Sequence, residues 1–495
     1  TLMGISFSMM VSIPPYLITC VALNGIEEYT MKICSTNLNE LYGDPFLRCD
    51  VDNILMRQTH DFTAYHRLTE FITFIETGKA ITKEDYTESS QNVHFLVRNI
   101  SEGKPLYENL IYITEEKAEE LADFRIKKDD VIIAISSNCG AAFLYEGERS
   151  ENITLSHYLC RLRVDSSVLR PKYLVYYLNS PLMREYFRGV ETGKTQKNLS
   201  KVYIHNLPVY LPTLEQQDKL CETIAPFDSE ITRLKATILQ TQDIIDKVFQ
   251  REFSFDYDTF NRLKAIKTHS INLFSFGNNP DLRFSPKFHR QAGTFVMDQL
   301  LKLTDKKIKH FLSEPIVLGA SISPDDYSNE GDHYYISMAT IKNWSFNSEG
   351  ASIVSKKYSD AKCDKTVRKN DIILARSGEG TIGKVALIED EKLKGIFADF
   401  TMRIRLKDYN PEFAYYYFRT TYFQYLIEVY KKGLGNNTNI FPIVIREFPL
   451  IDIPLPEQYR IVSEIHAEID KQKNLKAAIS DMQQQIDQIV EDSIS

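Results

Sequence analysis

An internal duplication limits the folds open to this 495-residue chain more than any other feature of its sequence. Residues 77–86, TGKAITKEDY, align with residues 318–327, LGASISPDDY, at an offset of 241 residues. The same offset pairs residues 130–134, DVIIA, with residues 371–375, DIILA, and such short apolar runs are typical of buried strands. A repeat of this length predicts two domains with one fold, since single cores stop growing at about 300 residues.

Each copy ends in a stretch with helical periodicity. Residues 211–223, LPTLEQQDKLCET, and residues 453–465, IPLPEQYRIVSEI, both place proline shortly before a Glu-Gln pair. Apolar residues then follow at alternating spacings of three and four. The positions expected to pack between the two helices are Ile224, Ile231, Leu234, Ile238 and Ile245 in the first and Ile465, Leu475, Ile479, Met482 and Ile486 in the second. Each helix could instead lie on its own domain, but two equivalent helices favour an antiparallel pair in which each covers the other.

The predicted fold class is therefore α+β. We expect two tandem homologous mixed α/β domains, at residues 45–211 and 255–452, separated by two long helices that pack as an antiparallel coiled coil. These spacer helices are expected at residues 212–254 and 453–495. The role of residues 1–44 is not indicated, although the proline pair in this segment disfavours a membrane span or an export signal.

Composition restricts the classes of function. The formal net charge of −8 requires that any phosphate binding be confined to local basic patches. The seven cysteines show no CxxC pair and no zinc-type spacing, which favours a reducing cytoplasm and predicts no metal site. The ten histidines show no ligand spacing such as HExxH. We therefore expect no catalytic residues, no metal ligands and no membrane partner.

Two polar loops at corresponding places in the repeats are candidates for DNA contact. They read GKTQKNLSK at residues 193–201 and KKGLGNNTN at residues 431–439. Lysines suit phosphate contacts that set position, whereas Asn and Gln side chains can read base edges. The candidate residues are Gly193, Lys194, Gln196, Lys197, Asn198 and Lys201 in the first loop and Lys431, Lys432, Asn436, Asn437 and Thr438 in the second. Either loop alone could be ordinary solvated surface, but their matched positions favour a shared function.

A glycine-containing segment, ARSGEGTIGK at residues 375–384, follows a predicted strand of the second copy. It nearly matches a P-loop, but Val385 occupies the position where a Mg²⁺-binding Ser or Thr is required. We expect its glycines to shape a loop that presents polar side chains to DNA. The candidates are Arg376, Ser377 and Lys384, with Ser136 and Asn138 in the corresponding segment of the first copy. Because the first copy lacks the arginine, the two domains are expected to prefer different sequences.

These features together resemble the specificity subunit of type I restriction-modification systems. The resemblance covers about residues 45–495 and depends on the duplicated order of the elements. It also depends on the Pro-x-x-Glu-Gln motif at residues 212–216 and 454–458, and on the Arg-Ser-Gly and Gly-Lys-Val elements of residues 373–388. The resemblance implies a non-catalytic chain. Each of its two target-recognition domains would read one half of a bipartite DNA target, and its helices would dock adenine-N6 methyltransferase subunits.

The resemblance further implies the partners: double-stranded DNA, two methyltransferase subunits and, in some systems, a restriction subunit that acts as a motor. The chain itself would bind no cofactor, since S-adenosylmethionine would belong to the methyltransferase and ATP with Mg²⁺ to the motor. One alternative is the targeting subunit of a type IIB-like or other two-subunit system, whose partner both methylates and cuts. Another is a self-contained DNA-modifying enzyme that uses residues not recognised by these patterns.

Overall fold

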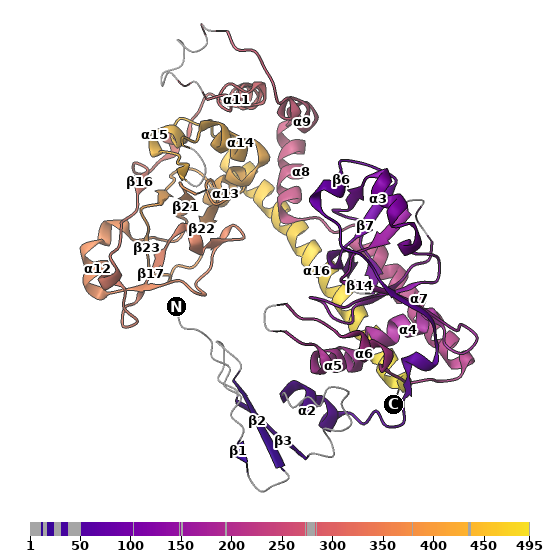
Figure 1. The fold of residues 1–495 in the computed structure, drawn as a ribbon. Helices are drawn as coiled ribbons and strands as arrows, with labels where there is room; N and C mark the ends of the chain where they lie inside the picture. The colour runs from indigo at the N-terminus through magenta and orange to yellow at the C-terminus, as the bar shows by residue number, and fades with distance from the viewer. Residues whose placement is uncertain are drawn as a thin grey trace. The chain divides into compact units, whose positions relative to one another are not determined.

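The chain folds into two compact units in the computed structural model (Figure 1). Unit 1 comprises Thr1–Ala236 and Ala478–Ser495, and unit 2 comprises Thr237–Ala477. The structure describes residues 11–12, 17–23, 31–37, 51–101, 103–147, 149, 152–193, 196–272, 274, 283, 285–378, 380–433 and 437–494. The unit boundaries therefore fall inside the predicted spacer helices, and unit 1 includes the last turns of the chain.

Unit 1 begins with a small antiparallel sheet of order β1-β2-β3, formed by β1 (Val11–Ser12), β2 (Leu17–Leu23) and β3 (Met31–Asn37). Helix α2 (Val51–Thr59) follows and packs against α5 (Pro181–Val190). The buried Asn53 side chain donates to the carbonyl of Gly189 over 3.0 Å. A Cβ on Gly189 would lie 2.9 Å from the Cβ of Met56, so this crossing requires glycine.

Two sheets form the mixed α/β domain of unit 1. The first has the order β12-β11-β14-β5 and is antiparallel throughout, whereas the second has the order β13-β7-β10-β6 and includes a parallel β13–β7 pair. Their strands are β5 (Ile72–Thr77), β6 (Tyr86–Thr87), β7 (Asn92–Phe95), β10 (Ile111–Ile113), β11 (Val131–Ala134), β12 (Ala142–Leu144), β13 (Asn152–Leu155) and β14 (Leu159–Val164). All four residues of β11 are buried, as its apolar sequence predicts.

Short elements and helices complete the described part of unit 1. Strand β4 (His66–Arg67) pairs with β15 (Pro208–Val209), and β8 (Ile100–Ser101) pairs with β9 (Lys104–Pro105). The other α-helices between residues 51 and 236 are α3 (Glu115–Glu120), α4 (Pro171–Leu178), α6 (Lys201–His205) and α7 (Leu214–Lys235).

Unit 2 repeats this topology, which confirms the predicted pair of homologous mixed α/β domains. Its first sheet has the order β16-β24-β21-β22, the counterpart of β5-β14-β11-β12, and its second has the order β20-β17-β23 with a parallel β17–β23 pair. The strands are β16 (Val317–Leu318), β17 (His333–Ile336), β20 (Ile353–Val354), β21 (Ile372–Ala375), β22 (Val385–Leu387), β23 (Gly395–Phe397) and β24 (Thr401–Ile404). A hairpin of β18 (Ile341–Lys342) and β19 (Ser345–Phe346) corresponds to β8–β9.

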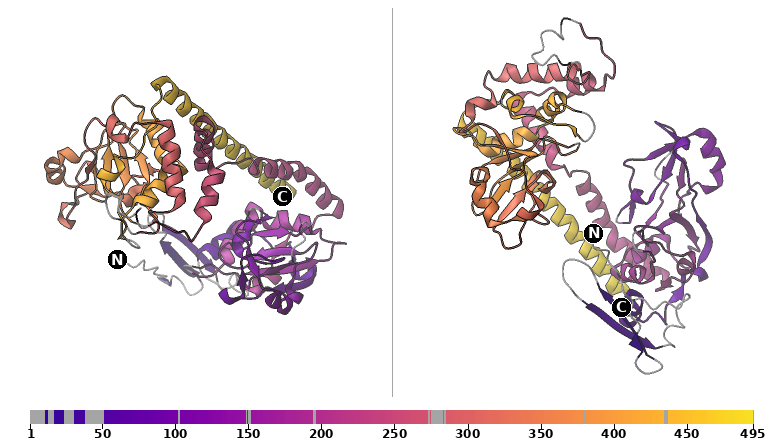
Figure 2. Two further views of the ribbon diagram at one scale, coloured as in Figure 1. Left: turned by 90° about the horizontal axis from the view of Figure 1, so that it is seen from above. Right: turned by 60° about the vertical axis from the view of Figure 1, so that its left-hand side comes forward.

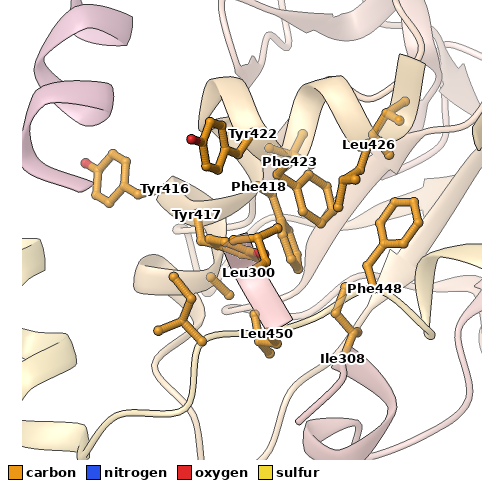
Figure 3. Close-up of a cluster of buried hydrophobic side chains, with 14 of the residues drawn as sticks. Leu300, Ile308, Tyr416, Tyr417, Phe418, Tyr422, Phe423, Leu426, Phe448 and Leu450 are labelled. Carbon is orange, nitrogen blue, oxygen red and sulfur yellow. The ribbon is translucent and has the colours of Figure 1, made fainter. Parts of the chain in front are cut away.

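The helices of unit 2 surround a large aromatic core (Figure 3). Tyr417 and Phe418 are fully buried, and the Tyr417 hydroxyl donates to the carbonyl of Pro449 over 2.8 Å, as Tyr177 does to Pro208 in unit 1. The helices around this core are α9 (Tyr257–Ala265), α11 (Gln291–Leu303), α13 (Pro411–Arg419), α14 (Thr421–Tyr430) and α15 (Pro442–Ile445). Helix α12 (Lys356–Ala361) contributes Tyr358 to a separate buried cluster with Tyr335. The tyrosine-rich segments 173–187 and 413–427 each contain parts of two short helices and not of one long helix, because Ser180 and Thr420 cap a second helix there.

The spacer segments differ from each other. The second is one continuous helix, α16 (Leu455–Ile494), which two further views also display (Figure 2). The first is not the single helix expected over residues 212–254, because it divides into α7 and α8 (Thr241–Phe253). In the break, the backbone N–H of Leu239 donates to the buried Gln472 side chain over 2.9 Å. Gln472 thus satisfies a backbone donor near the start of α8.

The described helix contacts in unit 2 are antiparallel. Arg251 of α8 pairs with Glu464 at 2.5 Å, and Glu252 pairs with Arg460, while Leu239 meets Gln472 farther along α16. Every predicted seam residue is buried or half-buried. However, Ile245 and Ile465 also belong to the unit 2 core with Phe413 and Tyr417, so their apolar faces are shared between the helix pair and the domain. A coiled coil along the whole spacer stays a prediction.

Candidate nucleic-acid interface

The two predicted polar segments of unit 1 lie against each other. Ser136 forms a bridge to Asn198, and the backbone N–H of Ser137 donates to the carbonyl of Lys197 over 2.8 Å. The Gln196 amide donates to the Ser136 hydroxyl over 2.9 Å. Residues about 60 positions apart in the sequence therefore form one surface of unit 1.

A tight turn presents the second of these segments. The backbones of Thr192 and Asn198 exchange two hydrogen bonds, each 2.8 Å long. Between them Gly193 adopts a φ of +105°, and a Cβ at this position would lie 2.1 Å from the carbonyl oxygen of Gln196. This turn therefore requires glycine for a steric reason.

Unit 2 builds the same arrangement with different side chains. Lys432 and Asn439 exchange backbone hydrogen bonds of 2.8 and 2.7 Å, and Ser377 bridges to Asn439. Gly433 has a φ of +104°, and a Cβ there would lie 2.2 Å from the carbonyl oxygen of Asn437. The structure therefore brings the predicted segments together in both units, with one extra residue in the second turn.

The candidate side chains differ in accessibility. Asn138, Gln196, Asn198, Lys201 and Asn437 are exposed, and Lys197, Arg376, Lys384, Lys431 and Lys432 are half-buried. Lys197 and Lys431 form ion pairs with Glu191 at 3.2 Å and with Glu428 at 2.6 Å. Lys194 and Asn436 lie outside the described residues.

For three candidate residues, burial contradicts the prediction that they contact DNA. The side chains of Ser136, Ser377 and Thr438 are buried, and the two serine hydroxyls donate to the carbonyls of Lys197 and Thr438 over 3.2 Å. Buried side chains cannot reach a base edge, and the two serine hydroxyls have already donated their single O–H. These residues hold the loops together, so we no longer expect them to contact DNA.

The sequence analysis missed several residues of the surface. Asn439 is the counterpart of Asn198, and the offset of 241 residues could have identified it. Tyr158 in unit 1 and Phe400 in unit 2 are exposed aromatic residues at corresponding positions, because their carbonyls accept from Ile135 and Arg376 respectively, each over 2.9 Å. No spacing rule identifies these rings, since exposure depends on the fold.

The Arg376 side chain is held by several neighbours. Its Nε donates to the carbonyl of Asp399 over 2.9 Å, and its Nη1 donates to the Asn439 side chain over 3.3 Å. The guanidinium carbon lies 5.9 Å from the ring centroid of Phe400 and 5.8 Å from that of Phe441, within the range of cation–π attraction. In unit 1 the position of Arg376 is occupied by Ile135.

The duplicated Glu-Gln motif attaches each spacer helix to its mixed α/β domain. In unit 1 the side chain of the buried Gln217 accepts from the backbone N–H of Arg170 over 2.7 Å and donates to the carbonyls of Val168 and Pro212 over 3.0 and 2.9 Å. In unit 2 the buried Gln458 accepts from the N–H of Asn410 over 2.8 Å. The Pro-x-x-Glu-Gln motif aligns Gln216 with Gln458, whereas these hydrogen bonds show that Gln217 is the counterpart of Gln458. The alignment predicted from the motif is therefore displaced by one residue.

No reactive nucleophile is apparent in the described loops. Burial and the neighbouring Glu191 raise the pKa of the Cys139 thiol to about 12, which keeps it protonated at neutral pH. Among the described residues, no cluster of three or more His, Cys, Asp or Glu side chains could hold a metal ion. None of the described helices combines the length and apolar character needed to cross a membrane.

Comparison with known protein families found one family model that matches both repeats of the chain. A family model described as the type I restriction modification DNA specificity domain matches residues 63–241 and 315–481. The two matches coincide with the two repeats and together cover more than half of the sequence. The protein therefore belongs to the family of type I restriction-modification specificity subunits, whose role is to determine DNA sequence specificity.

Solved structures of low sequence identity were also found. The type I restriction-modification S subunit from M. genitalium is 14% identical over 86% of this chain and 94% of that chain, with a TM-score of 0.42. A structure reported for complex assembly and conformational transition of the type I R-M system is 15% identical over 87% and 97%, with a TM-score of 0.45. The HsdS subunit from Thermoanaerobacter tengcongensis is 14% identical over 89% and 99%, with a TM-score of 0.34. No curated protein matches.

Proposed function

We propose that the chain recognises a bipartite DNA target as the non-catalytic specificity subunit of a type I restriction-modification complex. The observation that carries this proposal is the pair of loop surfaces, which have the same backbone arrangement but different side chains. Each unit has exposed amides near these loops, together with lysines that are exposed or half-buried, and such groups suit base and phosphate contacts respectively. Two different surfaces on one chain would read two different half-sites.

The spacer helices would dock two methyltransferase subunits. The exposed fractions of Leu455 and Tyr459 are 40% and 59%, although both residues lie in the first turns of α16. Exposed apolar and aromatic side chains of this kind are typical of protein interfaces. S-adenosylmethionine would be bound by the methyltransferase, and ATP with Mg²⁺ by a restriction subunit if the system has one. We place the assembly in the cytoplasm because the cysteine pattern favours a reducing compartment.

The test is to express the chain with the methyltransferase encoded beside it in a host that lacks adenine methylation. Sequencing that detects N6-methyladenine should then reveal one split motif, and the motif should vanish when this chain is omitted. A methyltransferase that marks the same sites without the chain would overturn the proposal. Measurable methyl transfer by the chain alone would also overturn it and would favour a self-contained enzyme. A partner that cuts as well as methylates would favour a two-subunit system.

A further inference from the structure

One guanidinium in unit 2 is positioned on an exposed apolar surface. Arg376 lies near the rings of Phe400 and Phe441, whose exposed fractions are 45% and 38%. The side chain of Ile443, in the helix that begins at Pro442, is 64% exposed. We refer to Arg376, Phe400, Phe441 and Asn439 together as the arginine clamp. Apolar side chains that are exposed next to one another are typical of interaction sites, so this group of residues points to a ligand that covers them.

The hydrogen bonds of the clamp leave specific donors available. Nε is committed to the carbonyl of Asp399, and Nη1 makes one bond to the Asn439 side chain. Among the described residues, Nη2 has no hydrogen-bond or ion-pair partner. Nη1 retains a second N–H and Nη2 retains both of its own, because guanidinium carries five N–H donors in a planar fork. Two adjacent nitrogens can therefore donate to one ligand.

We propose that Arg376 reads a guanine in the half-site bound by unit 2, an inference that rests on the proposed function. Two parallel donors match the O6 and N7 acceptors of guanine in the major groove, the commonest specific contact that arginine makes with DNA. A guanidinium stabilised by neighbouring rings and two hydrogen bonds loses little side-chain entropy on binding. The clamp is thus organised before DNA arrives.

The surroundings favour a base over a phosphate. Phosphate contacts are made by basic groups along a hydrated backbone, and Phe400, Phe441 and Ile443 would gain nothing from that environment. The same apolar groups fit base edges and thymine methyl groups within a groove. The partly buried hydrogen bond from Arg376 Nε to the carbonyl of Asp399 also fixes the side chain in one direction, which a non-specific charge contact does not require.

Unit 1 lacks this device at the corresponding place. Ile135 replaces the arginine, and Ser200 stands at the position of Phe441. Of the two aromatic positions of the clamp, unit 1 keeps an aromatic residue at one, where Tyr158 corresponds to Phe400. The half-site bound by unit 1 is therefore read without an arginine at this position, and the guanine contact should belong to one half of the target alone.

The test uses the complex of this chain with its methyltransferase in cells that lack other adenine methylation. Wild-type protein and the variants Arg376→Lys and Arg376→Gln would be compared by mapping N6-methyladenine and by measuring binding to DNA with single-base changes. Both variants should lower the preference for guanine at one position of one half-site about 5-fold to 150-fold. The other half-site should keep its preferences. Arg376→Lys retains the charge but loses the planar fork, so it should lose guanine preference as Arg376→Gln does.

Two controls separate readout from folding and charge. Phe441→Ala leaves Arg376 intact and should lower the guanine preference less than Arg376→Lys does, with an unchanged melting temperature. Lys392→Gln removes an exposed charge from unit 2 and should leave the motif unchanged. A uniform loss of affinity across all sequences in both Arg376 variants would identify a phosphate contact and overturn the inference. A wild-type complex that marks no motif at all would overturn the proposed function itself.

Discussion

Unit 1 and unit 2 share their hydrogen-bonded framework but differ in the side chains that it presents. The turns at Gly193 and Gly433 are closed by equivalent backbone bonds, and Gln217 and Gln458 anchor equivalent helices. In contrast, Ile135 and Arg376 occupy one shared position with opposite chemical character. The comparison indicates that backbone contacts maintain the duplicated fold, while side chains at partly exposed positions such as these differ between the units.

The largest expected effect on the shared framework comes from replacing a buried carboxylate at the start of each central strand. Asp130 pairs with Arg163 in unit 1, and Asp371 pairs with Arg405 over 2.6 and 2.7 Å in unit 2. Both carboxylates are buried and also accept a backbone N–H. Asp130→Asn and Asp371→Asn should each reduce the free energy of unfolding by about 3 to 5 kcal/mol, because each breaks an ion pair whose carboxylate is buried. The arginines are half-buried, and Arg405 keeps a second partner in Glu314, so the loss at Asp371 should be the smaller of the two.

Denaturant unfolding of the purified chain, followed unit by unit with hydrogen exchange, measures this effect. Asp129→Asn is a matched control, since Asp129 is exposed with a φ of +69° and unit 2 already has Asn370 at that position with a φ of +73°. The control should change stability by less than about 0.5 kcal/mol. A large loss in one unit and none in the other would show that the two frameworks are not energetically equivalent.

Sequence pattern predicted the parts of the fold that depend on repetition and burial. The offset of 241 residues located β11 and β21, because apolar strands are recognisable without their partners. It could not predict the break between α7 and α8, which depends on Gln472 reaching a backbone N–H more than 230 residues away. The candidate loops were identified by composition, but composition could not distinguish the buried Ser136 from the exposed Asn198.

A second prediction is that the stability of the two units depends differently on pH. Burial lowers the pKa of His94 to about 4, and its Nδ1 lies 2.9 Å from the Thr154 hydroxyl. Unfolded His94 would titrate near its ordinary value of 6.5, so the unfolded chain binds more protons between pH 6.5 and pH 4. The stability of unit 1 should therefore fall by about 3 kcal/mol across this window as pH decreases.

The corresponding residue in unit 2 is Tyr335, which donates to the carbonyl of Ala320 and does not gain a proton in this range. Hydrogen exchange in β7 and β17, measured for wild type and His94→Gln, compares the units directly. The variant should remove the acid sensitivity of β7 relative to wild type and leave β17 unaffected. An identical pH dependence for wild type and variant would refute the assignment.

A third, smaller effect concerns the glutamine that attaches each spacer helix. Gln217→Ala and Gln458→Ala should each cost about 1 to 3 kcal/mol, because buried backbone groups lose their partners. Gln216→Ala is the neighbouring control, and it should cost less than about 1 kcal/mol since Gln216 is exposed and contributes only to the capping box of Thr213. Thermal unfolding of the three variants provides the measurement. Equal costs at Gln216 and Gln217 would restore the motif alignment predicted from the sequence.

The smallest expected difference lies in the salt dependence of DNA binding. Lys197 in unit 1 corresponds to Thr438 in unit 2, because both carbonyls accept a hydrogen bond from the adjoining loop. The Lys197 side chain is 43% exposed beside Glu191, whereas Thr438 is buried and uncharged. Lys197→Gln should therefore reduce the slope of log affinity against log salt by about 0.9 for every DNA sequence, as the loss of one phosphate contact requires.

Thr438→Val is the matched variant in unit 2, and it should leave the salt slope unchanged because no charge is removed. Titrations of the methyltransferase complex with one specific and one unrelated duplex, at several salt concentrations, distinguish the two variants. If Lys197 instead read a base, its replacement would weaken the specific duplex alone. If the pair with Glu191 already neutralised Lys197, the slope would not change, and the positive contact of unit 1 would have to come from Lys201, which is exposed in the following helix.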